Sequence, residues 1–330
     1  MTQLLNNPIL LPLLLPMLMG LVCLLIPNLA SGLRSILTVL TTALVLALVW
    51  PLFQQADLLQ DTLPWLSWRV DALSAFTLLA VAFFGLLIAV YSVGYMKGRA
   101  RHREYFTYLL WTLGASCAVV LANELLLLLV CWGFLGLMLY LMAGLSGPDA
   151  AGAARKSLMI IGGSDALMLL GIAIYWQLAG NTRMDGPAIA LNGPLAYTAF
   201  LTLVAAAFAK AGAVPFHSWV PGFGEKTDAP VSAYLPASLD KLLGIYLLAR
   251  CFLDLFIPTP AMYGMLMLLG AITVISAVLM ALVQHDLKRL LSFHAVSQVG
   301  YMILGIGTGT AIGLAGGLFH MLNNTIYKSS

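Results

Sequence analysis

The sequence predicts an all-α fold, a polytopic bundle of transmembrane helices. Of the 330 residues, 61% are hydrophobic and only 9% are charged. A soluble globule of this composition would lack the polar residues that cover a wetted surface. Apolar stretches of about 20 residues, the length that spans a bilayer core about 30 Å thick, recur along the whole chain. We therefore expect most of the surface to face lipid.

About eleven such stretches define the expected spans. Their separators are short and rich in Gly, Pro and charge, and none is long or polar enough for a soluble domain. Residues 1–330 are therefore expected to form a single transmembrane domain, whose first helix is retained because no basic signal region precedes it. The spans lie near residues 8–26, 33–53, 71–93, 104–121, 123–145, 155–178, 196–216, 231–251, 262–284, 289–308 and 311–330.

The Lys and Arg residues of the loops predict an orientation. Cytoplasmic loops are enriched in these residues. The odd-numbered loops should therefore be cytoplasmic, which puts the N-terminus outside the inner (plasma) membrane of a prokaryotic cell. The even-numbered loops carry only Arg69, Arg183 and Arg250. The odd-numbered loops carry ten basic residues: Arg34, Lys97, Arg99, Arg101, Arg103, Arg155, Lys156, Lys226, Lys288 and Arg289.

Several function classes are excluded by what the sequence lacks. A nucleic-acid partner would need a soluble basic surface, and none is expected. There is no dinucleotide fingerprint, P-loop, nucleophile elbow or cysteine cluster for iron and sulfur. The four cysteines occur singly in apolar segments without metal-ligand spacing. We expect no metal and no cofactor, and assign any redox chemistry to partner subunits.

Ionisable residues inside spans are the functional candidates, because each costs several kcal/mol in lipid unless it faces protein or water. Lys210 lies in AAAFAKAGAVPFHSWVP, where Pro215 cannot donate to the carbonyl of Ala211. This predicts a discontinuous helix near Lys210 to Pro215, and broken helices at membrane depth usually line wet cavities. Lys210 could there load and release a proton, or it could simply extend to the interface.

Asp240 and Lys241 form a second candidate position, in a span that Pro236 also interrupts. Adjacent residues do not face each other on a helix, so the two side chains should have partners on different helices. They could serve proton transfer or a structural ion pair.

Two polar stripes are expected in the last two spans, each along one helix face. Facing each other, they would hold a hydrated proton path or would join the helices by hydrogen bonds. The first stripe comprises His294, Ser297, Gln298 and Tyr301, and the second His320, Asn324 and Lys328.

Two carboxylates complete the set. Asp165 follows Gly162, Gly163 and Ser164, small residues that allow close helix approach, and it could pair with Lys210. Glu124 begins a span and is expected to be a solvated or capping carboxylate.

Four segments carry a resemblance to a known family: YSVGYM at 91–96, KAGAVPFHSWVPGFGEKTDAPVSA at 210–233, HDLKRLLSFHAVSQVGYM at 285–302 and FHMLNNTIYKS at 319–329. Together they resemble the antiporter-like membrane subunits of respiratory complex I (NADH:quinone oxidoreductase), of energy-converting membrane-bound hydrogenases and of Mrp-type Na⁺/H⁺ antiporters. The resemblance runs nearly from end to end of the chain. It implies a proton-translocating subunit, with Na⁺ open as the ion, among homologous antiporter-like and quinone- or hydrogenase-module subunits.

The resemblance also implies roles for individual residues. Lys210 matches the central pumping lysine, and Lys241 lies within about one residue of the bridging lysine or histidine. Asp165 matches the acidic residue of a Gly-Asp motif, and Lys328 the lysine of the histidine-rich helix. The implied relay therefore consists of Lys210, Lys241, Asp165, Lys328, His320, His294 and Asp240.

Three departures from the family pattern leave alternatives open. Gly133 follows Trp132 where the family has a glutamate, and Pro236 and Asn324 stand where many complex I members have histidine. The chain ends at Ser330 within an apolar stretch, so we expect a complete first inverted repeat and a truncated second one, from a fragment or a split subunit. The alternatives to a redox-driven translocating subunit are an Mrp-type antiporter subunit and a non-transporting scaffold.

Overall fold

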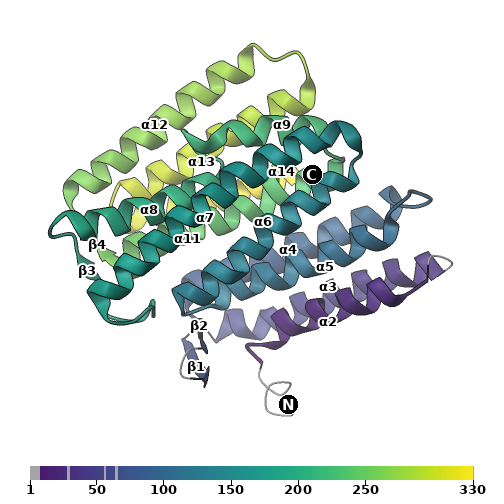
Figure 1. The fold of residues 1–330 in the computed structure, drawn as a ribbon, viewed down its shortest axis with the longest axis horizontal. Helices are drawn as coiled ribbons and strands as arrows, with labels where there is room; N and C mark the ends of the chain where they lie inside the picture. The colour runs from purple at the N-terminus through teal and green to yellow at the C-terminus, as the bar shows by residue number, and fades with distance from the viewer. Residues whose placement is uncertain (1–7, 28–29, 56, 64–65, 330) are drawn as a thin grey trace. The chain divides into compact units, whose positions relative to one another are not determined.

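The computed structural model describes residues 8–27, 30–55, 57–63 and 66–329, which form two compact units, Met1–Leu145 and Ser146–Ser330. The described residues of the first unit form five helices and a short hairpin (Figure 1). Its helices are α2 (Leu11–Leu25), α3 (Ser31–Gln54), α4 (Ala72–Tyr95), α5 (His102–Leu121) and α6 (Leu125–Leu145).

The hairpin pairs β1 (Leu58–Leu63) with β2 (Leu66–Val70) in antiparallel fashion and was not predicted. It occupies the separator between α3 and α4, which the hydropathy pattern marks only as a break between spans. Side chains hold it in place, because Ser67 is buried and accepts a hydrogen bond from the Asn123 side-chain amide. The all-α fold class is nevertheless confirmed, and the hairpin is a local addition at this separator.

The second unit contains the more interrupted helices (Figure 1). A two-residue parallel pairing of β3 with β4, also not predicted, joins two of its loops. Its elements are η2 (Pro148–Ala150), α7 (Ala151–Ala179), β3 (Ile189–Ala190), α8 (Pro194–Ala211), η3 (Phe216–Trp219), α9 (Val220–Lys226), α10 (Ala229–Tyr234), η4 (Leu235–Leu239), α11 (Asp240–Arg250), η5 (Cys251–Leu255), β4 (Phe256–Ile257), α12 (Pro260–Leu282), α13 (Leu287–Gly307) and α14 (Ala311–Ser329).

Each expected span coincides with helical residues of the described chain, and the helical membrane bundle is confirmed. Eight helical stretches are long and apolar enough to cross a membrane, and α2 is a shorter apolar helix. Large hydrophobic side chains such as Ile36, Leu268 and Ile275 are exposed on the helix surfaces. Such surfaces are stable against lipid and not against water, so the protein is an integral, multi-pass membrane protein. The count of eleven spans remains a prediction.

The predicted break beside Lys210 is confirmed. The helix α8 ends at Ala211, because Gly212 adopts φ 77°, a left-handed conformation that glycine reaches without strain. The chain then continues through η3 into α9. Three hydrogen bonds satisfy backbone groups at the break: Ala213 N to Phe208 O, Trp219 Nε1 to Ala209 O, and Val214 N to Thr273 Oγ1.

The helix that carries Lys241 is also irregular, as expected at Pro236. Residues 235–239 form the π-helical segment η4, which continues directly into α11. Such wide turns are frequent at functional sites.

Close packing of α11 on α8 depends on Gly244. A Cβ at this position would lie 2.6 Å from Ala211 N and 2.8 Å from Ala207 O. Only glycine therefore allows α11 to approach the end of α8, and this approach sets the distance between the polar side chains of the two helices.

Candidate proton-translocation site

Lys210 and Asp240 form a buried ion pair beside the helix break. The Nζ–Oδ1 distance is 3.7 Å, and the exposed fractions of the two side chains are 0% and 4%. Lys210 lies in the last turn of α8, where the helix dipole favours a cation. The charge of Asp165 on α7 also attracts Lys210. Lys210 can therefore stay charged while fully buried, because the two carboxylates offset much of the free-energy cost of removing its charge from water.

Asp240 is the partner of Lys210 that sequence reasoning did not assign. The sequence indicated that Asp240 and Lys241 have partners on different helices, and the structure confirms this. Asp240 faces Lys210 on α8, whereas Lys241 faces Asn324 on α14. Two consecutive residues at the start of α11 thus contact polar side chains on two different helices.

Lys241 begins a chain of four hydrogen bonds that crosses from α11 to α14 and α13. Its Nζ donates to Asn324 Oδ1 at 3.3 Å, and Asn324 Nδ2 donates to the Tyr327 hydroxyl at 3.1 Å. Tyr327 donates to Gln298 Oε1 at 3.0 Å, and His320 Nε2 meets the same oxygen at 3.0 Å. We call these five residues the polar chain. Direct hydrogen bonds therefore join the two predicted stripes.

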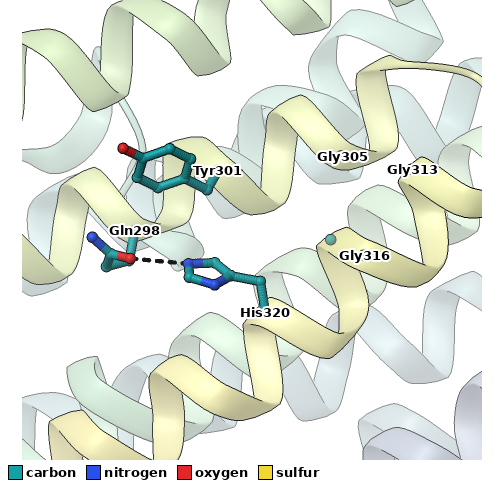
Figure 2. A pocket seen from close by; sticks show the side chains of 7 residues that line it. Gln298, Tyr301, Gly305, Gly313, Gly316 and His320 are labelled. Atoms are coloured by element: carbon teal, nitrogen blue, oxygen red, sulfur yellow. Dashed lines mark hydrogen bonds between the residues drawn. The ribbon is translucent and has the colours of Figure 1, made fainter.

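A groove of about 580 Å³ lies between α13 and α14 at the His320 end of the polar chain. Figure 2 shows His320 pointing from α14 toward Gln298 on α13, with Tyr301 beside it. The glycines of both helices allow this approach, since a Cβ on Gly305 would lie 2.7 Å from Gly317 Cα. The groove is lined by Gln298, Tyr301, Gly305, Gly313, Gly316, Gly317 and His320.

The two polar groups differ in charge. Lys210 has carboxylates near it, but among the described residues the charges that act on Lys241 and on the two histidines are those of Lys241 and Lys328. His294 Nδ1 is buried without a hydrogen-bond partner in the described part of the chain. The charges that act around Lys241 are therefore all positive. The two histidine rings there can accept protons.

The structure thus brings the seven predicted site residues into two groups. Lys210, Asp240 and Asp165 form one, and Lys241, His320, His294 and Lys328 the other. Sequence reasoning missed Tyr327, although it lies seven residues after His320 and therefore on the same helix face. Of the two alternatives for Glu124, a solvated or a capping carboxylate, the solvated one is wrong, because Glu124 is only 6% exposed directly before α6. Within the described ranges, no group of three or more His, Cys, Asp or Glu side chains could hold a metal ion.

Two family models match the chain. Residues 122–330 match the NADH:quinone oxidoreductase/Mrp antiporter transmembrane family, and residues 64–106 match the N-terminal region of chain 5 of NADH-ubiquinone oxidoreductase (complex I). The chain is 33% identical over 290 residues to F420H2 dehydrogenase subunit L of Methanosarcina mazei, covering 79% of this chain and 43% of that protein. It is 34% identical over 272 residues to the chloroplast NAD(P)H-quinone oxidoreductase subunit 5 of Zygnema circumcarinatum, covering 79% of this chain and 38% of that protein.

Solved structures share the fold. A chain of the Mrp complex from Dietzia sp. superimposes with a TM-score of 0.88 at 23% identity, covering 98% of this chain and 36% of that one. A chain of the membrane-bound sulfane sulfur reductase, an archaeal respiratory membrane complex, gives 0.85 at 21% identity, covering 98% and 68%. The chain spans less than half the length of the curated relatives named above. On the family match over residues 122–330, it belongs to the NADH:quinone oxidoreductase/Mrp antiporter transmembrane family.

Proposed function

We propose that this protein translocates protons across the membrane as an antiporter-like subunit of a redox-driven complex. The observation that carries the proposal is the buried Lys210–Asp240 pair, which lies at a helix break and next in sequence to Lys241. Amines and imidazoles that load and release protons suit this task. A Na⁺ site would instead need a shell of oxygen ligands.

The proposed relay uses the two groups in turn. Lys210 holds a proton against Asp240 and Asp165, and releasing it requires weakening those two attractions. Lys241, His294, His320 and Lys328 offer acceptor sites, and repulsion among their charges favours one proton at a time. The Nζ–Oδ1 distance of 3.7 Å makes this contact an ion pair, so the charge of Asp240 controls how readily Lys210 gives up its proton.

The partners proposed are other membrane subunits. The curated relatives are named as subunits of an F420H2 dehydrogenase and of an NAD(P)H-quinone oxidoreductase. We infer that this chain likewise works beside a redox module, which supplies the electron chemistry. A chromosomal neighbourhood of hydrogenase or quinone-reductase genes would support this. A run of small antiporter genes would support a stand-alone Mrp-type antiporter instead.

Transport can be tested on the complex purified through this chain and reconstituted in liposomes. Addition of the redox substrates is expected to acidify the liposome interior, measured with a pH-sensitive dye, and a protonophore should abolish the signal. Redox turnover without acidification at any Na⁺ concentration would reject proton translocation. Acidification that requires Na⁺ would show that Na⁺ takes part in transport, and the role of the subunit in ion translocation would stand.

We further propose the orientation that the loop charges indicate, with the N-terminus outside the inner membrane. Lys97 lies in an odd-numbered loop and Asn181 in an even-numbered one, and both are exposed. In inside-out vesicles, a Lys97→Cys variant should react with a membrane-impermeant maleimide and an Asn181→Cys variant should not. The native cysteines are buried or half-buried, which keeps background low. The opposite labelling pattern would invert the topology.

A further inference from the structure

The direction of every hydrogen bond in the polar chain follows from Lys241. An ammonium group has donors and no acceptor, so Asn324 must present its oxygen to Lys241. The Asn324 amide nitrogen then faces Tyr327 and donates to it, which turns the Tyr327 hydroxyl proton toward Gln298.

Gln298 is fixed at both ends of its amide. Its oxygen receives the Tyr327 proton, and its nitrogen donates to Ser297 Oγ at 3.3 Å, whose own proton is used on His294 O. His320 Nε2 faces the same Gln298 oxygen and must therefore carry a proton. A charged Lys241 thus determines which nitrogen of His320 is protonated.

The two amides of the chain orient hydrogen bonds but do not titrate, since Asn and Gln side chains neither gain nor lose a proton in this range. A proton on Lys241 consequently cannot reach His320 along the chain. His320 lines the groove, and its other nitrogen, Nδ1, is not used by the chain (Figure 2).

Resting on the proposed function, we infer that Asn324, Tyr327 and Gln298 are positioning residues, which transmit the charge state of Lys241 to His320 as hydrogen-bond direction. They hold the neutral imidazole of His320 with its proton on Nε2. The relay proton then binds at Nδ1, giving an imidazolium, and leaves from Nδ1 again. The other titratable groups near the chain are His294 and Tyr301 on α13 and Lys328 on α14. The charge of Lys328 repels that of Lys241, and the Tyr301 ring packs against the His320 ring with centroids 5.7 Å apart.

Loss of the proton from Lys241 removes the constraint. A neutral amine can accept a hydrogen bond, so the amides of Asn324 and Gln298 can turn over. The Gln298 nitrogen would then donate to His320 Nε2, which requires the proton on Nδ1. This change relocates one proton within His320, by exchange with water, and adds none.

The test is the tautomer of His320 in the native complex labelled with 15N-histidine, measured from the imidazole 15N shifts across a pH titration. The tautomer is read at the pH where the ring is already neutral and Lys241 still carries its proton. The signal is assigned by its loss in a His320→Gln variant. We expect a single Nε2–H tautomer in the parent. Gln298→Leu, which lacks the acceptor, should give a mixture, whereas Gln298→Glu should keep the parental tautomer. Gln284→Leu, which removes an amide that bonds only locally to Met280 O, is the matched control.

A second comparison tests transmission. Lys241→Met should shift His320 away from the pure Nε2–H form, and the same substitution should have no further effect in a Tyr327→Phe background. An Nδ1–H form or a mixture in the parent, or a Gln298→Leu spectrum like the parent's, would overturn the inference. The parental spectrum decides even if a variant does not assemble. Because the tautomer is observed without transport, a failure of the inference is distinguishable from a failure of proton pumping.

Discussion

Replacing Lys210 with alanine is expected to reduce proton pumping by the reconstituted complex by about tenfold or more. A tenfold loss of rate corresponds to only about 1.4 kcal/mol, and removing a positioned proton donor or acceptor generally costs more than that. Assembly should survive, because Asp240 can become neutral when its cation is removed. The measurement is dye-reported acidification per redox turnover, with complex assembly followed by native gel.

Two further variants make this experiment specific. Lys210→Arg keeps a positive charge beside Asp240 but cannot release its proton, so it should assemble normally and still fail to pump. Lys226→Ala removes an exposed lysine that pairs with Glu225 and should pump like the parent. Normal pumping by the Lys210→Ala complex would remove Lys210 from the relay.

The helix break shows what sequence alone can predict here. Pro215 removes a backbone donor at a known place, so the interruption was expected. The break lies earlier in the chain than the proline alone indicates, because α8 already ends at Ala211 and Gly212 adopts a left-handed backbone conformation. Local chemistry therefore predicts that a helix breaks, and the available backbone conformations decide where.

The partner of Lys210 lay outside such reasoning. Asp240 is thirty residues further along the chain, and its distance from Lys210 depends on how closely α11 packs on α8 through Gly244. Helical periodicity predicts which residues share a face of one helix, as it did for the stripes of His294 and His320. It does not predict which faces of two helices meet, and this explains why Tyr327 and Gln298 were not identified as a junction.

The hairpin of β1 and β2 was missed for a different reason. Hydropathy averaged over the length of a span shows where a polar segment separates two spans. It does not show whether that segment forms strands. The hairpin is held by contacts such as Asn123 with Ser67, which link residues far apart in sequence. Short strands of this kind depend on tertiary contacts more than on their own propensity.

Replacing Asp240 with leucine is expected to destabilise the protein strongly, by about 3–5 kcal/mol, because it removes a partner of a fully buried lysine and leaves the charge less compensated. The readout is the denaturation midpoint of the purified complex in detergent. Adding Lys210→Met should recover most of the loss, since a buried pair can be replaced by apolar residues of similar volume at little cost. Pumping should stay lost in both variants.

The matched control is Asp185→Leu, which breaks an exposed ion pair. The side chains of Arg183 and Asp185 are 28% and 25% exposed, so losing this pair should lower the free energy of unfolding by less than about 1 kcal/mol. If the double variant were no more stable than Asp240→Leu, the electrostatic pairing would not explain the loss. If both retained pumping, the ion pair would be structural only, and translocation would have to be sought elsewhere in the chain.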